Sequence, residues 1–304
     1  MSTQALYYRH SGQCTTPSLF STLAIAVVAA VILGPIYGII VYYMPLVYIN
    51  ALLTFGLGIV LGLIIKTTAM SKHIRSLPMV MLIALVAGLV AEYAAFVGWL
   101  LAVRQWSPLV VSPGQLFSDL EKVAEVGVWS FKSTTVKGGF LIGIWGIEAI
   151  VVVGATIYFA YDEISKTPYC ETCLQWLPNK TMVGPFEKVS DPVGLRASLE
   201  QGEFGVLGNI KPLAADAGAA EFTDYELTDC PTCPDMAVVS IRNVTLVADK
   251  NGNVTPKIQA IVDRMLIDHD SCELIKQLGP QAETVSETAA KDDSEEPSPT
   301  EKDE

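Results

Sequence analysis

The sequence predicts a membrane α protein, in which a four-helix transmembrane bundle is followed by a small α+β, zinc-ribbon-like soluble domain and a disordered acidic tail. Three features predict this class: four long apolar runs in the first half, two C-x-x-C pairs in the second half, and an acidic carboxyl-terminal stretch. The composition agrees, because only 17% of the 304 residues are charged, whereas soluble globular proteins have about 25%.

Four apolar runs reach the length of a membrane span. A helix needs about 20 mostly apolar residues to cross the bilayer core, and the runs that meet this length are 19–43, 46–65, 79–103 and 139–160. The first run could be a signal peptide, but it is longer than the usual apolar segment of such a peptide and lacks a strongly basic region before it. We therefore expect residues 1–18 to form an amino-terminal cytoplasmic segment and 19–160 the transmembrane domain.

Two connections in the bundle have predictable structure. The first two spans are joined by a short turn around Met44-Pro45, near four tyrosines that are typical of an aromatic belt at a membrane interface: Tyr37, Tyr42, Tyr43 and Tyr48. The outer loop 104–138 contains a helix with Ser112 at its amino-terminal cap, Gln115 at capping-box spacing, and Gly127 after its end. Its apolar residues Leu116, Phe117, Leu120 and Val123 share one face. This amphipathic helix either lies on the membrane surface or packs on the bundle.

Basic residues in the flanks predict the orientation. Five lie on the side that carries both termini, namely Arg9, Lys66, Lys72, Arg75 and Lys166, whereas four lie in the long loop 104–138 on the opposite side. Lysine and arginine are enriched in cytoplasmic flanks. Both termini are therefore predicted to be cytoplasmic.

Two carboxylates lie within the spans. Glu92 and Glu148 are each near the middle of an apolar run, where an ionised carboxylate costs a few kcal/mol, so both are expected to face the bundle interior. If the helices bring them together, one is expected to be protonated at neutral pH. The pair is then either a proton- or cation-responsive site, with hydrogen bonds from Tyr93, Trp99 or Trp145, or a polar lock between helices.

Small residues recur at four-residue spacing within the spans. The pairs are Gly34/Gly38, Gly58/Gly62, Ala84/Gly88 and Gly139/Gly143. Such pairs let helix backbones approach closely. They serve packing within the bundle or, alternatively, a homo-oligomer interface.

Residues 161–280 predict a small α+β domain. Asp191 before Pro192, with Gly202 beyond, predicts a short helix. Two alternating strands flank Asn251-Gly252, a hairpin signal, and "DSCELIKQLGP" predicts a final short helix.

Two C-x-x-C pairs favour a shared metal site. Cys170 and Cys173 form the first pair, and Cys230 and Cys233 form the second. Four thiolates suit a tetrahedral structural Zn²⁺ site. The 56 residues between the pairs exceed the usual 15–20, which predicts an insertion between the two halves of a zinc ribbon.

Other uses of these cysteines remain open. The pairs could instead be redox centres of a membrane thiol-disulfide oxidoreductase, although neither opens a clear amphipathic helix, as a thioredoxin-like motif would. His269 and Cys272 could add an H-x-x-C half-site, or could be ordinary surface and core residues.

The stretch 281–304 has nine acidic residues against two lysines, a composition typical of disorder. Residues 161–304 are strongly acidic as a whole, whereas nucleic-acid binding requires a basic face. We therefore expect a protein partner for this region and no nucleic acid. No serine-histidine-aspartate, P-loop, Rossmann or H-E-x-x-H motif occurs, so an enzyme is not expected.

The membrane half resembles a known family. "YYRHSG", "GPIYGIIVYYMPLVYINALLTFGLGIVLG" and "GVWS…VKGGFLIGIWGIEA" are similar to patterns in a family of bacterial four-span membrane proteins with no assigned activity. This resemblance implies a bacterial inner-membrane protein and gives weight to Glu148, which lies within "WGIEA".

Taken together, the sequence favours a membrane-anchored interaction or scaffold module, stabilised by one structural zinc. The alternatives are a small proton- or cation-linked transporter or sensor that uses Glu92 and Glu148, and a thiol oxidoreductase.

Overall fold

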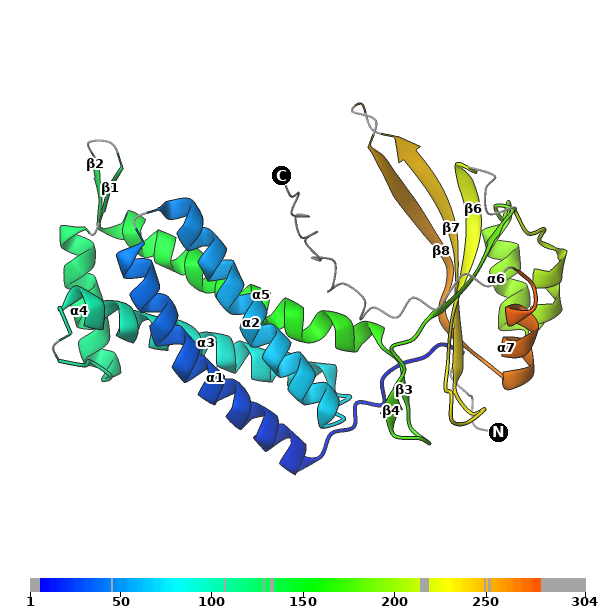
Figure 1. The fold of residues 1–304 in the computed structure, drawn as a ribbon, viewed down its shortest axis with the longest axis horizontal. Helices are drawn as coiled ribbons and strands as arrows, with labels where there is room; N and C mark the ends of the chain where they lie inside the picture. Colours follow the sequence, from blue (N-terminus) through cyan, green and yellow to red (C-terminus); the bar gives the residue numbers. More distant parts are fainter. Residues whose placement is uncertain are drawn as a thin grey trace, which may run out of the picture. The chain divides into compact units, whose positions relative to one another are not determined.

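In a computed structural model, the chain forms two compact units (Figure 1). The first unit is His10–Thr167, and the second unit combines Met1–Arg9 and Pro168–Glu304. The structure describes residues 6–44, 46–106, 108–127, 129–131, 134–213, 219–248, 250 and 253–279. The predicted turn residue Pro45, the hairpin dipeptide Asn251-Gly252 and the acidic tail 281–304 lie outside the described residues.

Four helices of the first unit are long and apolar enough to cross a membrane. They are α1 (Thr16–Tyr43), α2 (Val47–Ser71), α3 (Leu77–Val103) and α5 (Gly139–Lys166). Each helix reaches beyond its predicted apolar run at one end. The extension of α5 past residue 160 is polar, and a Lys166–Asp162 ion pair supports its last turn.

The connection between α3 and α5 contains α4 (Pro113–Val126) and a small hairpin, β1 (Trp129–Phe131) with β2 (Thr134–Val136). Gly127 follows α4 with φ 87°, as its role as a stop requires, but the Ser112 side chain makes no capping hydrogen bond. Leu116 and Leu120 are buried in a cluster with residues of α3, whereas Phe117 is 65% exposed. Among the described residues, α4 therefore packs on the bundle through part of its apolar face.

Glycines set the closest helix contacts of the bundle. A Cβ at Gly34 would lie 2.5 Å from the Ala91 carbonyl oxygen, and one at Gly38 would lie 2.0 Å from that of Ala95, so α1 packs directly on the α3 backbone. Gly58 and Gly62 do the same for α2 against α5, since a Cβ there would meet Ala155 and Phe159. These small-residue pairs are thus occupied within the bundle.

The second unit is built on an antiparallel sheet, in the order β5-β6-β7-β8. Its strands are β5 (Thr181–Phe186), β6 (Glu221–Asp229), β7 (Ala237–Ala248) and β8 (Val254–Ile267). The helices α6 (Pro192–Glu200) and α7 (His269–Lys276) and the 3₁₀ helix η1 (Phe204–Asn209) lie beside it (Figure 1). The strands β3 (Tyr169–Cys170) and β4 (Gln175–Trp176) form a separate hairpin.

The alternation of residues along β6 explains the two faces of the sheet. Tyr225 and Leu227 are buried in the core, where the Tyr225 ring stacks on that of Phe186 with centroids 4.4 Å apart. Asp224 and Glu226 point to the other face, and both pair with Arg242 of β7 at 3.0 Å. One face therefore packs under the helices and the other is charged, as is typical of an antiparallel sheet.

The predicted helices and hairpin of this unit are confirmed. The Asp191 carboxylate accepts a hydrogen bond from the Gly194 amide at 2.9 Å and caps α6, and Gly202 follows with φ 84°. Asp268 caps α7 in the same way through the Ser271 amide. The strands β7 and β8 pair along their length, from Ala237↔Ile267 to Ala248↔Val254.

The amino-terminal segment adds to this sheet, which the sequence does not predict. The Tyr8 amide donates to the Arg264 carbonyl at 2.8 Å, and the Leu266 amide donates to the Leu6 carbonyl at 2.9 Å. The Tyr7 hydroxyl also donates a hydrogen bond to the Glu200 carboxylate of α6 at 2.7 Å. The expected segment 1–18 is thus divided, because Met1–Arg9 belongs to the same unit as the sheet and the bundle unit begins at His10.

We predict that Gly38→Ala destabilises the bundle by about 1–3 kcal/mol, the usual cost of overpacking, because its Cβ would overlap the Ala95 carbonyl. Gly143→Ala is the matched control, since a Cβ at Gly143 meets nothing within 4 Å. Thermal unfolding of the detergent-solubilised chain measures both, and equal melting temperatures for the two variants would contradict this packing.

We predict that Tyr7→Ala loosens the contact of the amino-terminal segment with β8, because it removes the hydrogen bond to Glu200 and the contact of the tyrosine ring with Arg196. Hydrogen bonds to charged groups contribute about 1.5–3 kcal/mol. Hydrogen–deuterium exchange of the full chain should accelerate in the peptide that contains Leu266. Tyr48→Ala, at a tyrosine that is 91% exposed, should leave that peptide unchanged.

Candidate metal centre and intramembrane cavity

The first cysteine pair lies at the turn of the β3–β4 hairpin. Tyr169 pairs with Trp176 and Cys170 pairs with Gln175, so the chain reverses between Cys170 and Gln175. Leu174 completes this reversal with φ 53°. The Cys173 amide lies 3.5 Å from the Cys170 Sγ and donates to it. The hairpin thus brings the two thiols of the pair together.

The second pair lies at the turn between β6 and β7. The Cys230 amide donates to the Met236 carbonyl at 2.8 Å and closes the turn that contains Cys233. Gln175, from the first hairpin, reaches across to this turn. Its side-chain amide donates to the Cys230 Sγ and to the Thr232 hydroxyl, each at 3.1 Å.

The four thiols converge on one point. The Sγ atoms of Cys170, Cys173, Cys230 and Cys233 all lie within 4.8 Å of one another, and those of Cys170 and Cys233 are 3.6 Å apart. Zinc–sulfur bonds of about 2.3 Å in a tetrahedron place sulfur atoms roughly 3.8 Å apart. All six cysteines of the chain are free thiols in the structure. The four therefore fit the donor set of a tetrahedral metal ion.

Hydrogen bonding favours a thiolate at one corner of this cluster. Burial opposes ionisation of Cys230, but bonds from the Thr232 and Cys233 amides and from Gln175 lower its pKa to about 6. Burial raises the pKa of Cys170, and hydrogen bonding with Cys233 raises that of Cys173. A bound cation would favour the thiolate form of the cluster.

The surroundings of the cluster differ from those of a simple zinc ribbon. The 56 residues between the two pairs include β4, β5, α6, η1 and β6. This segment supplies two strands of the main sheet, so it forms part of the body of the domain as well as linking the pairs. His269 and Cys272 do not join the cluster. Cys272 lies in the sheet core, where burial raises its pKa to about 11.

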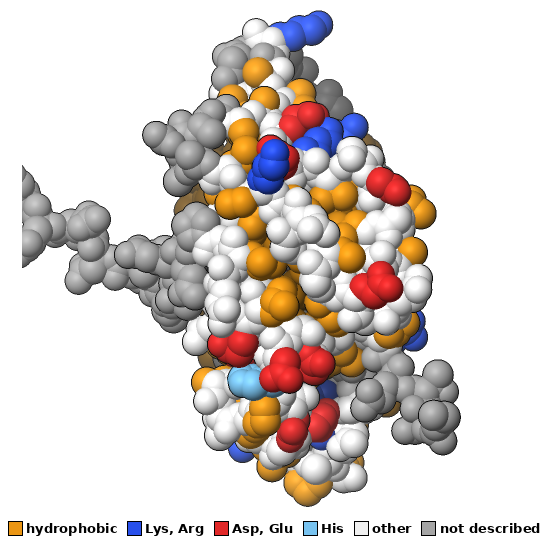
Figure 2. Space-filling model, turned by 90° about the vertical axis from the view of Figure 1, so that its right-hand side faces the viewer, with side chains coloured by type: hydrophobic (Ala, Val, Ile, Leu, Met, Phe, Trp, Pro, Cys, Tyr) orange, Lys and Arg blue, Asp and Glu red, His pale blue; other side chains and the backbone are white. Residues whose placement is uncertain are grey.

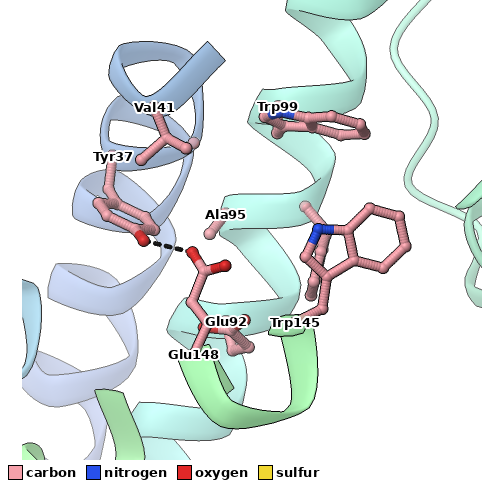
Figure 3. A pocket seen from close by; sticks show the side chains of 9 residues that line it. Tyr37, Val41, Glu92, Ala95, Trp99, Trp145 and Glu148 are labelled. Carbon is pink, nitrogen blue, oxygen red and sulfur yellow. Dashed lines mark hydrogen bonds between the residues drawn. The ribbon is translucent and has the colours of Figure 1, made fainter. Parts of the chain in front are cut away.

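The bundle contains a second cluster of polar groups, around a cavity of about 30 Å³ between α1, α3 and α5 (Figure 3). Both intramembrane carboxylates, Glu92 of α3 and Glu148 of α5, line it. Figure 3 shows them between Tyr37 on one side and Trp99 and Trp145 on the other. The Tyr37 hydroxyl donates a hydrogen bond to Glu148 and lies 2.7 Å from the Thr54 hydroxyl.

Tyr37 belongs to this site and not to the aromatic belt in which its sequence neighbours place it. It is buried, whereas Tyr42, Tyr43 and Tyr48 are exposed as an aromatic belt requires. Its position, six residues before the end of α1, corresponds to about 9 Å of helix. That depth is the signal that distinguishes it from the belt. Tyr93, expected near the carboxylates, instead donates to the Val111 carbonyl at 2.5 Å.

We predict one zinc ion per chain in the purified full-length protein, measured by elemental mass spectrometry. Cys170→Ser and Cys230→Ser should each lose it, because three thiolates leave the tetrahedral site incomplete. Cys14→Ser, at a thiol outside the cluster, should retain it. Metal-free protein with a reversible disulfide between these cysteines would refute the metal centre.

Comparison of the chain with profiles of protein families, with curated proteins and with solved structures finds no match.

Proposed function

We propose that this chain is a membrane-anchored interaction protein, whose helices fix it in the bilayer and whose second unit, stabilised by one structural zinc, binds a partner protein. The observation that carries the proposal is the convergence of four thiols from the β3–β4 hairpin and the β6–β7 turn. Four thiolates fill a tetrahedral shell and leave no open position for a substrate, so the metal has a structural role.

The placement of the cysteines favours a metal over redox chemistry. A redox C-x-x-C is typically activated at a helix amino terminus, whereas these pairs lie at two strand turns. Their thiols also face one another, with Cys170 and Cys230 buried. Iron also accepts four thiolates, and the elemental analysis above distinguishes it from zinc.

An exposed apolar strip on the β7–β8 hairpin supports a binding role. Cross-strand pairs Val244↔Ile258, Leu246↔Pro256 and Ala248↔Val254 place their side chains on one face. All of these except Val244 are exposed, and Ile258 is 55% exposed. The opposite face of the hairpin carries Asn243, Thr245, Val247, Thr255, Lys257 and Gln259. We call the five exposed residues Leu246, Ala248, Val254, Pro256 and Ile258 the apolar strip.

The hairpin reaches past the rest of the sheet. The last ladder pair between β6 and β7 is Glu221↔Thr245, and one further backbone bond joins Leu246 to Ala220. Beyond that point, the described residues of the hairpin pair only with each other. Exposed apolar surface of this kind marks interaction sites, and a two-stranded arm makes it accessible to a partner.

The charge of the region favours a protein as the partner. Residues 161–304 contain 27 acidic and 12 basic residues, which opposes binding to nucleic acid or to an anionic lipid surface. Figure 2 shows acidic side chains spread over one face of the molecule, with apolar side chains between them. We therefore commit to a partner protein that presents an apolar surface to the strip.

The basic flanks support a cytoplasmic location for this unit, at the inner membrane of a bacterium. Four crossings require both termini to lie on the same side, and Lys66, Lys72 and Arg75 flank that side in the loop after α2. The resemblance of the membrane half to bacterial four-span proteins points to the same compartment. The cytoplasm is reducing, which favours thiolates that bind metal.

We predict that a photo-crosslinking residue at position 258, in the full chain in native membranes, forms a discrete adduct with another protein. The full chain is required, because a fragment that starts at residue 161 lacks Leu6–Tyr8, which make two backbone hydrogen bonds to β8. The matched control places the same residue at Val247, on the opposite face of the hairpin. It should give no adduct of that mass.

A substitution within the apolar strip tests whether the crosslinked protein binds the strip or only lies near it. Leu246→Ser, which shortens the strip at a residue distinct from the crosslinking position, should reduce the yield of the adduct at least several-fold, and Val247→Ser should not. Adducts with lipid alone, with a second copy of this chain, or equally from both positions would refute the proposed partner surface.

A further inference from the structure

The cavity between α1, α3 and α5 contains a buried acidic group that no described residue satisfies. Glu92 is 7% exposed, lines the cavity, and its Oε2 atom has no hydrogen-bond partner among the described residues. A buried, unpaired carboxylate costs several kcal/mol. An apolar residue at this position of α3 would avoid that cost. The presence of a carboxylate here therefore points to a ligand.

Glu148 differs from Glu92 in this respect. It accepts a hydrogen bond from Tyr37, whose hydroxyl is in turn held beside Thr54 of α2. The second carboxylate is therefore built into a network that joins α1, α2 and α5. Of the two carboxylates that line the cavity, Glu148 thus has a hydrogen-bond donor, whereas the Glu92 Oε2 has none among the described residues.

The walls of the cavity provide no positive charge. Its nine lining residues include no lysine, arginine or histidine: Tyr37, Gly38, Val41, Glu92, Ala95, Phe96, Trp99, Trp145 and Glu148. The titratable groups that face Glu92 are Tyr37 from α1 and Glu148 from α5. Both are neutral or negative, so none of the lining residues supplies a balancing positive charge.

Size and chemistry define the cation that fits. A volume of about 30 Å³ holds about two to three water-sized species, because one needs about 10–15 Å³. Ca²⁺ requires six to eight oxygen ligands and Mg²⁺ retains several waters, more than two carboxylates and one hydroxyl provide here. A small monovalent cation needs less neutralising charge and can also contact the aromatic rings of Trp99, Trp145 and Phe96, which attract cations at their faces.

We propose that this cavity binds one small monovalent cation, with the Glu92 carboxylate as the principal ligand and Glu148, positioned by Tyr37, as the second. The site is independent of the zinc centre, because all of its residues lie in the unit His10–Thr167. It adds a cation-binding activity to the membrane-spanning half, beyond the anchoring role proposed above.

The test is equilibrium binding of radioactive sodium to the purified full chain in detergent, with competition by potassium, ammonium and choline chlorides. We expect saturable binding of one ion per chain, displaced by small cations but not by choline, which is too large for the cavity. Glu92→Gln and Glu148→Gln keep the side-chain shape and should each weaken binding at least tenfold. Glu125→Gln, at an exposed residue of α4, is the charge-matched control and should bind like the unmodified chain.

Melting temperatures, measured at constant ionic strength, provide a second readout that shows whether each variant is folded. Sodium should raise the melting temperature of the unmodified chain relative to choline, and this difference should vanish in the two Gln variants although they still unfold cooperatively. Binding that survives in both variants would refute the site. A response to pH that is identical in sodium and choline, and that is lost in Glu92→Gln, would show that the cavity takes a proton and would likewise overturn the proposal.

Discussion

The close approach of α1 to α3 is the contact on which the membrane-spanning half depends. In lipid there is no hydrophobic force between helices, so association relies on close packing and on hydrogen bonds. Gly34 and Gly38 of α1 meet the α3 backbone with no room for a Cβ, and Gly98 of α3 meets Pro35 in the same way. This contact brings Tyr37 to the same cavity as Glu92 and within hydrogen-bonding range of Glu148. The hydrogen bond between Tyr37 and Glu148 thus depends on the close helix packing that these three glycines allow.

The four thiols play the corresponding part in the second unit. They join the short β3–β4 hairpin, which has only two residue pairs of its own, to the turn between two central strands. A two-stranded hairpin is marginally stable alone, whereas structural zinc contributes on the order of 10 kcal/mol at neutral pH, comparable to the whole stability of a domain. A metal bound here would therefore determine whether the hairpin stays joined to the sheet.

The sequence predicts those helices and strands that are determined by residues within the segment itself. Length and apolarity identify the four long helices, and Asp191 before Pro192 identifies α6. The isolated bridge between Tyr7 and Met265 could not be found in this way, because it depends on contact with β8, more than 250 residues away in the chain. The same holds for β5, whose sequence "TMVGPF" contains glycine and proline, two residues that weaken strands in isolation. The cysteine spacing identifies the four thiols that the structure brings together, but no spacing rule reveals that Gln175 would reach Cys230.

The asymmetry between the two carboxylates distinguishes the two hypotheses for them. A polar lock requires each buried group to have a partner, because an unsatisfied buried group costs more than a satisfied one contributes. Glu148 meets this condition through Tyr37, and a lock is a sufficient explanation for it. Glu92 lines the cavity and does not meet this condition, since its buried Oε2 has no hydrogen-bond partner among the described residues. A purely structural role would be served better at position 92 by an apolar residue of similar volume, and this is the reason for proposing that the Glu92 carboxylate is a ligand.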